Sequence, residues 1–370
     1  MELRHEDMAA LIEAVDVLCA ADPDRLADGE TVVQLHVQLE RLKAVVTRAT
    51  AAFDAAGEWE ADGARSAAAW VAARCRTPVT TAKAQVRVGR DLRTMPASEA
   101  AWLEGHIGEA QVEALAAAKR RVGAERFDPD EAQLVGHAKD LPYRQFRQVV
   151  AYWEQAVDPD GAEDRAAEQR DGRRLHLSQS FEGVWFLDGL LDPVSGEIVS
   201  RALQRIDQEL FEADSAAGTD RTPAQRRADA LVEMARRAAA VPPGARMPEP
   251  LLTVLVGYET LAGRVCELAS GTVITPGSLL PWLTEANVER VVFDGPDRVK
   301  NVGHRRRLFS GATRRAVEVR DRACYSPYCD APAEDCQIDH VVPFARGGPT
   351  IDTNGRPACG YHNRIRQRPP

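Results

Sequence analysis

The sequence predicts an α+β chain with several domains, mainly helical at its N-terminus, mixed in its middle and small and cysteine-rich at its C-terminus. Residues 1–157 keep the apolar spacing of helices almost throughout. Residues 158–297 alternate helical stretches with short apolar runs bounded by Gly and Pro, a pattern typical of strands. Residues 298–370 hold four of the seven cysteines and carry net positive charge. These three ranges are the predicted domains.

The N-terminal region contains a heptad pattern. Apolar residues alternate at spacings of three and four over three heptads, which is the a/d seam of packed helices. We interpret the seam as part of a bundle within the chain, in preference to a homo-oligomer contact, which stays open as the alternative. The seam residues are Val32, Leu35, Leu39, Leu42, Val46, Ala49 and Phe53. Further helices are expected near residues 66–74, 81–92, 109–121, 129–139 and 143–157.

The middle region reads as a mixture of helices and strands. The charged stretch 158–172 is expected to be a linker or exposed loop. A strand or hairpin follows at 175–187, helices at 197–211 and 223–240, and short strands at 251–257 and 288–294. Five aromatic residues are expected in the core rather than on a stacking surface: Trp70, Trp102, Tyr152, Trp153 and Trp185.

Composition limits the class of protein. The chain is 44% hydrophobic and 28% charged, and no stretch reaches the roughly 20 apolar residues of a membrane span. No secretory signal is visible, and clustered thiols without a signal favour metal binding over disulfides, so a cytoplasmic location is expected. The net charge of −9 is divided unevenly. Residues 298–370 contain 14 Lys and Arg against 7 Asp and Glu, which predicts contact with a polyanion.

The C-terminal thiols have the spacing of a metal site. Cys324 and Cys329 are separated by four residues in a turn-rich stretch, and thirty residues later Cys359 and His362 are separated by two. Two such pairs predict a tetrahedral Cys3His site for structural Zn²⁺. Cys336 is a fifth candidate ligand, although we favour a small buried hydrophobic role for it.

Between these pairs lie residues suited to acid–base chemistry. The segment 337–344 is expected to be a strand entering a loop, so that Asp339 and His340 point to opposite faces. One side chain then suits a cation and the other a water molecule. Asn354 follows fourteen residues after His340 and precedes a short return strand and a closing helix at 361–368. Asn363 comes nine residues after Asn354. The combination predicts a site for cleaving phosphodiester bonds.

This constellation resembles the HNH endonucleases, which have a ββα-metal fold. More broadly, the chain is similar to the actinobacterial 13E12-repeat proteins, which pair a helical DUF222 domain with a C-terminal HNH nuclease. The wider resemblance is carried by RRADAL at 226–231, the run 271–283, HRRRLFS at 304–310, TRRAV at 313–317 and the Cys324-x4-Cys329 pair. It covers nearly the whole chain, and only the HNH motif is specific about chemistry.

The resemblance implies a metal-dependent DNA endonuclease with a one-metal mechanism. It assigns His340 as general base, Asn354 as the residue that positions it, and Asp339 and Asn363 as ligands of Mg²⁺ or Mn²⁺. DNA is the implied partner, and its phosphates are expected to meet a basic stretch at 298–322 with nine Lys and Arg against two acids. The candidate phosphate contacts are Arg305, Arg306, Arg307, Arg314, Arg315 and Arg346.

Three departures from the family pattern keep a second interpretation open. Asn363 stands where relatives commonly have His, and Gly355 stands where they usually have an apolar residue, which would give the return strand less to pack. The sequence also stops soon after the closing helix. The alternative is a zinc-stabilised DNA-binding or adaptor protein of a mobile element whose nuclease has decayed.

Overall fold

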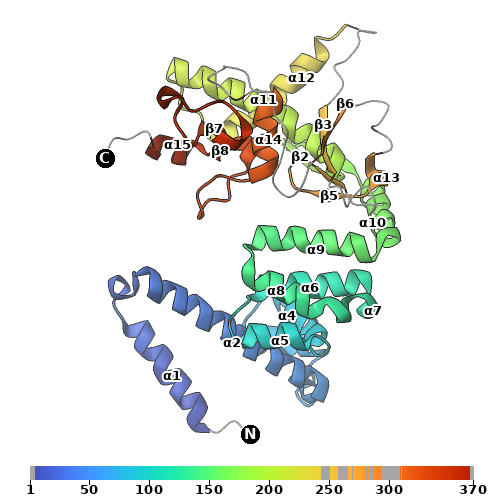
Figure 1. Cartoon of the computed structure of the whole chain (residues 1–370). Coiled ribbons are helices and arrows are strands. Elements are labelled where there is room, and N and C mark those ends of the chain that lie inside the picture. Colours follow the sequence, from blue (N-terminus) through green and yellow to red (C-terminus); the bar gives the residue numbers. More distant parts are fainter. Residues whose placement is uncertain are drawn as a thin grey trace. The chain divides into compact units, whose positions relative to one another are not determined.

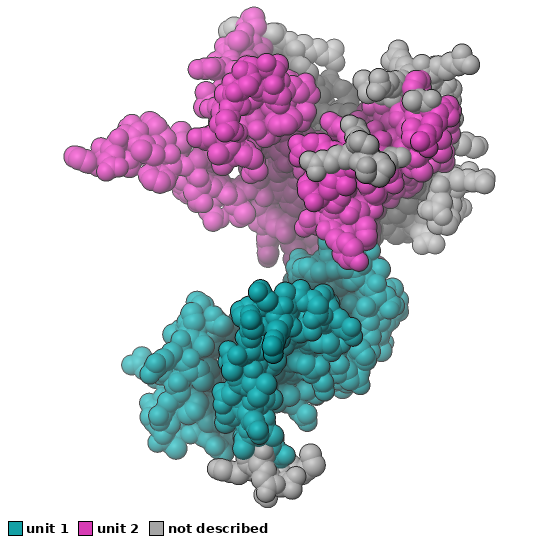
Figure 2. Space-filling view, turned by 90° about the vertical axis from the view of Figure 1, so that its left-hand side faces the viewer, with its two compact units in different colours: residues 1–150 teal, residues 151–370 magenta. Residues whose placement is uncertain are grey.

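The computed structural model of the chain describes residues 5–242, 251–256, 266–268, 270–279, 282, 287–292, 309 and 311–366. The chain is mostly helical, with few small strands (Figure 1). It divides into two compact units, Met1–Val150 and Ala151–Pro370 (Figure 2).

The first unit is a helical bundle around large buried side chains. Trp102, Phe127 and Phe146 are each no more than 1% exposed. One buried carboxylate, that of Glu131, accepts hydrogen bonds of 2.8 Å from both the backbone N–H and the hydroxyl of Ser98, so its burial is compensated. The helices are α1 (His5–Ala20), α2 (Gly29–Ala56), α3 (Ala67–Cys75), α4 (Val79–Leu92), α5 (Pro96–Leu103), α6 (Glu109–Val122), α7 (Ala124–Phe127), α8 (Glu131–Asp140) and α9 (Tyr143–Val157), the last of which continues into the second unit.

The heptad seam of α2 differs from its predicted placement. Helix α2 buries Ala44, Thr47 and Ala51. The seam lies on the other side of the helix, and Val32, Leu39, Leu42 and Val46 are 37–49% exposed. At the end of the seam, Phe53 packs against the core cluster that includes Ala67 and Val86. The preference for a bundle within the chain is therefore wrong for most of the seam, because a different face of the same helix carries the internal packing.

In its described residues, the second unit combines helices with three small sheets. Strands β5-β4-β3-β6 form a four-stranded sheet in which β3 and β6 are parallel and the other pairs antiparallel, while β1–β2 and β7–β8 are antiparallel pairs. The elements are α10 (Pro159–Asp171), β1 (Arg174–Gln179), β2 (Trp185–Leu190), α11 (Pro193–Ala217), α12 (Pro223–Ala239), β3 (Leu251–Val256), β4 (Cys266–Leu268), β5 (Val273–Ile274), α13 (Pro276–Leu279), β6 (Asn287–Val292), α14 (Gly311–Asp321), β7 (Gln337–His340), β8 (Gly355–Ala358) and α15 (Gly360–Arg366).

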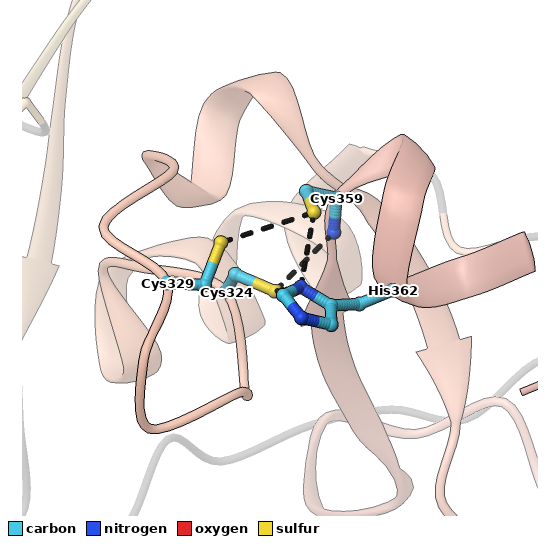
Figure 3. Close-up of side chains that lie close together, drawn as sticks. All are labelled: Cys324, Cys329, Cys359 and His362. Carbon is cyan, nitrogen blue, oxygen red and sulfur yellow. Dashed lines mark hydrogen bonds between the residues drawn. The ribbon is translucent and has the colours of Figure 1, made fainter. Parts of the chain in front are cut away.

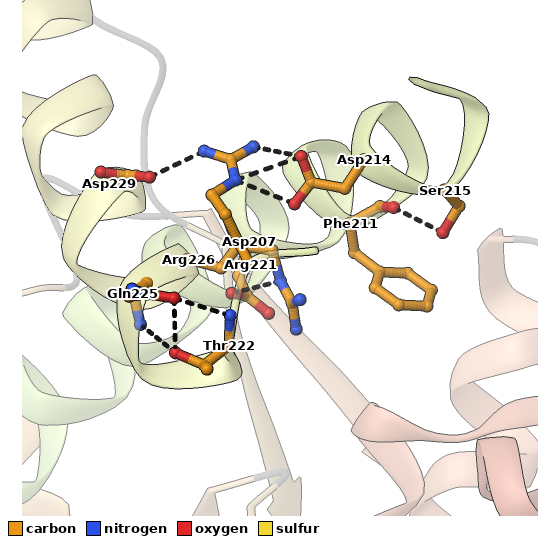
Figure 4. Close-up of polar contacts among 9 residues, drawn as sticks. All are labelled: Asp207, Phe211, Asp214, Ser215, Arg221, Thr222, Gln225, Arg226 and Asp229. Atoms are coloured by element: carbon orange, nitrogen blue, oxygen red, sulfur yellow. Dashed lines mark hydrogen bonds and ion pairs between the residues drawn. The ribbon is translucent and has the colours of Figure 1, made fainter. Parts of the chain in front are cut away.

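Arginines join α11 and α12 into a helical hairpin (Figure 4). Arg221, in the connection, reaches Asp214 at the end of α11 and Asp229 in α12, the latter at 2.7 Å. The guanidinium of Arg226 lies 3.0 Å from Asp207 and covers the ring of Phe211. The stretch 226–231 that supports the family resemblance thus lies in a structural contact between helices.

The predicted linker at 158–172 is wrong, because most of it is helix α10. Asp158 precedes the helix, Pro159 occupies its first turn, and Arg165 pairs with Asp158 at 3.1 Å. Pro at the first helical position favours a helix start. The sequence of helix α10 lacks the apolar stripe that marks most helices, and accordingly none of its residues is buried.

The predicted strand region at 175–187 is the hairpin β1–β2, in which every strand residue is exposed. Trp185 in β2 is 59% exposed, so its expected core position is wrong, whereas Trp102 is buried as predicted. Period-two patterning identifies a strand and does not say what covers it.

No helix in the described part of the chain combines the length and the apolar character needed to cross a membrane.

Candidate functional site: a Cys3His cluster beside a short hairpin

Four predicted zinc ligands come together in the structure. One ligand atom each from Cys324, Cys329, Cys359 and His362 lie within 4.8 Å of one another. Figure 3 shows the four side chains turned toward a common point. Within the described residues, this is the group of metal-binding side chains that meets this criterion. The spacing from sequence therefore predicted a real cluster that can hold a metal such as zinc.

The separations suit a tetrahedral ion. The sulfurs of Cys329 and Cys359 are 3.9 Å apart, and Nδ1 of His362 is 3.2 Å from the Cys359 sulfur and 3.4 Å from the Cys324 sulfur. Zn–S bonds of about 2.3 Å at tetrahedral angles place two sulfurs roughly 3.8 Å apart. The donor set, three thiols and one imidazole, is one that structural zinc sites use.

Backbone hydrogen bonds bring the two ligand pairs together. The N–H of Cys324 donates to Ala331, and that of Cys329 donates to Ser326, which closes the first turn. The N–H of Tyr325 donates to the carbonyl of Pro357 in β8 at 2.8 Å, so the turn is attached to the strand that leads to Cys359. The cluster thus fastens the 324–329 turn, β8 and α15 to one another.

The thiols of the cluster do not have equivalent acidities. Burial raises the pKa of Cys324, but hydrogen bonds from the backbone of Cys359 and Ser326 outweigh it and lower the pKa overall. The pKa of Cys359 is also lowered, since hydrogen bonds from His362 and the start of α15 outweigh burial. A lowered thiol pKa favours the thiolate, which is the form that binds metal.

Cys336 is not part of the cluster among the described residues. It is 2% exposed, its sulfur faces the carbonyl of Ala331, and burial followed by the nearby thiols raises its pKa to about 12. These features fit a buried apolar side chain rather than a fifth ligand.

The hairpin beside the cluster separates the two central candidates. Asp339 pairs in register with Arg356, and His340 pairs with Gly355. Because neighbouring strand residues point to opposite faces, the carboxylate and the imidazole lie on different sides of the hairpin. Asp339 shares its face with Gln337, two residues earlier.

On the first face, helix α15 brings Asn363 toward the strand. The Asn363 amide nitrogen donates to Oε1 of Gln337, so this residue lies over the face that carries Asp339. The guanidinium of Arg356 lies 3.7 Å from Asp339 and 3.8 Å above the ring of Tyr325. Sequence reasoning did not single out Arg356, although its position opposite Asp339 follows from the strand pairing.

On the second face, His340 is held in an apolar and hydrogen-bonded setting. It is 8% exposed, and its ring lies 4.6 Å from Phe309 and 5.6 Å from Phe344 between ring centres. Its Nε2 is 2.9 Å from the hydroxyl of Thr350. A partner at Nε2 fixes the orientation of an imidazole and selects its tautomer. The only signal for Thr350 in the sequence is its place ten residues after His340.

Asn354 fixes the loop between the strands. Its side-chain oxygen accepts from the N–H of Val342 at 2.9 Å, and its nitrogen donates to the carbonyls of Val342 and Pro349. A Cβ added at Gly348 would overlap the Val342 carbonyl. Asn354 therefore acts through the backbone that precedes Thr350, which is the hydrogen-bond partner of His340.

Arg320 of α14 secures the turn that carries Asn354. Its guanidinium donates to the carbonyls of Asp352 and Gly355, both at 2.7 Å, while Asp321 accepts two further hydrogen bonds. The hydrogen bonds to Asp321 raise the pKa of Arg320 further. Sequence reasoning counted Arg320 only as one of many basic residues.

Gly355 is a tightly packed position, which corrects the expectation that it weakens the return strand. A Cβ placed on it would meet Phe309 at 2.7 Å, Val317 of α14 at 2.8 Å and Ile338 of β7 at 3.0 Å. The neighbouring side chains already fill the space that an apolar residue would need. Glycine lets α14 approach the hairpin closely here.

We expect Gly355→Ala to destabilise this module by about 1–3 kcal/mol, because overpacking forces its neighbours to move. Gly360→Ala is the matched control, since nothing lies within 4 Å of a Cβ added there. Chemical denaturation followed by tyrosine and tryptophan fluorescence measures the difference. Equal midpoints for the two variants would contradict the close packing.

The predicted DNA-binding arginines fall into different settings. Arg305, Arg306 and Arg307 lie outside the described residues. Arg314 donates to the carbonyl of Cys336 at 2.9 Å and pairs with Glu318 at 2.6 Å, so it helps hold α14 on the module. Arg315 is half-buried in α14, and Arg346 is exposed in the loop between the strands.

Comparison with known proteins gives the relatives of the chain. It is 25% identical over 409 residues to uncharacterized protein Rv3776 of Mycobacterium tuberculosis, with 99% of this chain and 75% of the relative covered. It is 26% identical over 299 residues to uncharacterized proteins Mb1179c of Mycobacterium bovis and Rv1148c of Mycobacterium tuberculosis. For both, 73% of this chain and 64% of the relative are covered. No solved structure matches the chain significantly.

One family profile matches a large part of the chain. It covers residues 30–321, from the start of α2 to the end of α14, and ends just before the Cys3His cluster. Its description is a domain of unknown function. By this match over most of its length, the chain belongs to the DUF222 family.

Proposed function

We propose that the chain is a metal-dependent DNA endonuclease that hydrolyses phosphodiester bonds at the β7–β8 hairpin, with His340 as general base. The observation that carries the proposal is the Cys3His cluster, which joins β8 to α15 directly beside the hairpin that bears Asp339 and His340. The order β7, loop, β8 and α15 supports the proposal, because an HNH nuclease would use a strand hairpin followed by a helix.

The cluster would supply rigidity rather than chemistry. Zinc on Cys324, Cys329, Cys359 and His362 would keep α15 against the hairpin, where few apolar residues are available to do so. Closed four-ligand sites of this kind are structural because no position stays open for substrate.

The face that carries Asp339 would hold a catalytic cation. Asp339 offers a carboxylate, and Asn363 offers an amide oxygen, because its nitrogen donates to Gln337. Hard oxygen donors of this kind suit Mg²⁺ or Mn²⁺, which would supply positive charge beside the phosphate. The pair of oxygens fits the cation better than it fits a soft metal.

His340 would take the proton from water through Nδ1. If Nε2 donates its proton to the Thr350 hydroxyl, the lone pair lies on Nδ1. Thr350 and Asn354 are then positioning residues: the first sets the tautomer, and the second fixes the loop backbone that leads to it. Because Asp339 and His340 lie on opposite faces, the proposal requires the reacting water to lie at the end of β7, within reach of both side chains.

Contact with DNA would use exposed cations around the hairpin. Arg346 is exposed in the loop that follows β7 and can meet a phosphate. We leave Arg314 out of this interface, because its guanidinium is used in holding α14 to the segment before β7.

A plasmid-nicking assay tests the proposal. We expect supercoiled DNA to be nicked by the zinc-loaded protein when Mg²⁺ or Mn²⁺ is added and to stay intact with zinc alone. DNA binding, measured in parallel, should weaken steeply with salt because phosphate contacts release counterions. Intact plasmid in every metal, from protein that contains zinc and binds DNA, would contradict the nuclease.

One observation favours the alternative of a DNA-binding adaptor without nuclease activity. The guanidinium of Arg356 lies 3.7 Å from Asp339, so a positive charge already accompanies the carboxylate that would bind a cation. An adaptor would bind DNA in a zinc-dependent way and never nick it. Replacing Arg356 with Gln separates the two. In a nuclease it should lower the Mg²⁺ or Mn²⁺ concentration needed for nicking, whereas an adaptor should still not nick DNA at all.

A further inference from the structure

One face of helix α2 packs inside the helical bundle of the first unit. Ala44, Thr47 and Ala51 are at most 4% exposed. A Cβ added to Gly89 of α4 would lie 2.8 Å from Ala51 and 3.0 Å from the Thr47 carbonyl, so the two helices are in close contact along this face. This face of α2 is therefore already used in contacts within the chain.

The heptad seam points away from that contact. Val32, Leu39, Leu42 and Val46 are 41%, 49%, 37% and 44% exposed. A sustained a/d repeat is the pattern by which one helix packs along another. Within the described residues, the internal bundle uses the opposite side of α2, so Val32, Leu39, Leu42 and Val46 of the repeat stay exposed, and only its end at Phe53 reaches the core.

Helix α1 also exposes its apolar side chains. Every described side chain of α1 from Asp7 to Ala20 is exposed. They include Met8 at 47% and Ile12 at 57%, which keep helical spacing with Val15. A helix of 16 residues is marginal alone in water and is normally stabilised by packing of its apolar face.

The size of this surface suits an interface. Twelve large apolar side chains of α1 and α2 are 37–65% exposed, which is on the order of 1,000 Å² of apolar surface. A standard interface buries about 800 Å² per partner, so the apolar surface that these two helices expose in total is large enough to form one. The twelve are Met8, Leu11, Ile12, Val15, Val17, Leu18, Val32, Val33, Leu39, Leu42, Val45 and Val46.

The seam is chemically suited to pair with a copy of itself. Valines at two a positions, 32 and 46, and leucines at d positions, 35 and 42, are the arrangement that favours two-stranded association. The flanking e and g positions of these heptads carry one charge, Lys43, and that ammonium is paired with Glu40 at 2.8 Å. Two identical seams would therefore meet without like-charge repulsion.

We propose that the chain forms a homodimer in which the exposed seam of α2, together with α1, packs against the same helices of a second copy. The contact is isologous, since one surface meets its equivalent in the partner. It is independent of the nuclease proposal, because it lies in the first unit and involves no residue of the Cys3His module.

Sedimentation equilibrium of the full-length zinc-loaded protein tests the proposal. We expect a mass of twice 40.5 kDa at micromolar concentration. Leu39→Glu, which places a charge at the middle of the seam, should raise the dimer dissociation constant by at least about 30-fold, as for a central interface residue. Gln34→Glu is the matched control, because it adds the same charge at an exposed position of α2 off the seam and should leave the dimer intact.

Circular dichroism of each variant separates dissociation from unfolding. The Leu39 side chain is about half-exposed in the single chain, so replacing it should not disrupt the internal packing of the bundle. The Leu39→Glu monomer should therefore keep the helicity and the unfolding midpoint of a folded monomer. A 40.5 kDa species for the unmodified protein at tens of micromolar would overturn the proposal. A Leu39→Glu protein that remains dimeric would also overturn it. The same holds if the unmodified chain stays monomeric by itself and forms a complex only with a different protein.

Discussion

Cys359→Ala is expected to abolish zinc binding and to unfold the module formed by residues 324–366. Cys359 is at the centre of the cluster, 3.9 Å from the Cys329 sulfur and 3.2 Å from Nδ1 of His362. It also connects β8 to α15. Structural zinc contributes on the order of 10 kcal/mol to small modules, far more than the apolar residues here can replace. Elemental analysis for zinc and limited proteolysis of the C-terminal region measure the result.

Two other cysteines supply the controls for this experiment. Cys19→Ala changes an exposed thiol of α1 and should leave zinc content and proteolysis unchanged. Cys336→Ala should keep a full equivalent of zinc while lowering stability by a cavity cost of a few kcal/mol at most. Loss of zinc in Cys336→Ala would show that the site has a different ligand set, and full zinc in Cys359→Ala would contradict the cluster as the binding site.

Under the proposed mechanism, His340→Ala should reduce plasmid nicking by at least about 100-fold, because general-base catalysis typically contributes 10²–10⁴. Zinc content and DNA affinity should be retained, since His340 lies on the hairpin face away from the cluster and belongs to neither group of contacts. The side chain is 8% exposed beside Phe309, so truncation also leaves a cavity. His340→Gln keeps most of the volume without a group that accepts a proton at neutral pH, and it should lose the same activity.

The hydrogen bond to Thr350 gives a more selective version of the same experiment. Thr350→Val removes the hydroxyl 2.9 Å from Nε2 of His340 at nearly constant volume and should lower nicking by about 10–100-fold, in the range of other groups that orient a functional histidine. Thr350→Ser restores a hydroxyl and should restore most of the activity. If Val and Ser behave alike, Thr350 is only a packing residue. Nicking by His340→Gln at the unmodified rate would remove the imidazole from the chemistry.

Local patterns were sufficient to predict much of the module. Ligand spacing predicted the cluster of Cys324, Cys329, Cys359 and His362, because a zinc site is assembled from short, regular turns. Period-two geometry predicted opposite faces for Asp339 and His340. The same reasoning predicted most helices of the first unit, whose apolar stripes are continuous.

Contacts between distant segments could not be predicted in this way. Arg320 bonds carbonyls more than thirty residues away, and Arg314 bonds a carbonyl twenty-two residues away, so their basic character alone suggested nucleic-acid contact. The packing at Gly355 depends on α14 and Phe309, which its own neighbours in sequence do not reveal. Helix α10 was missed because its polar surface carries no periodic signal.

The attachment of α14 has a consequence for how the C-terminal module is inherited. The family match ends at residue 321, yet Val317 and Arg320 of that last helix pack on or bond to the turn and strand at 352–355. A fragment that starts after the boundary would lose the helix that shelters Gly355 and fastens the Asn354 turn. A gene fusion or deletion that transfers this module in folded form must therefore cut the chain before α14, within the region that the family profile matches.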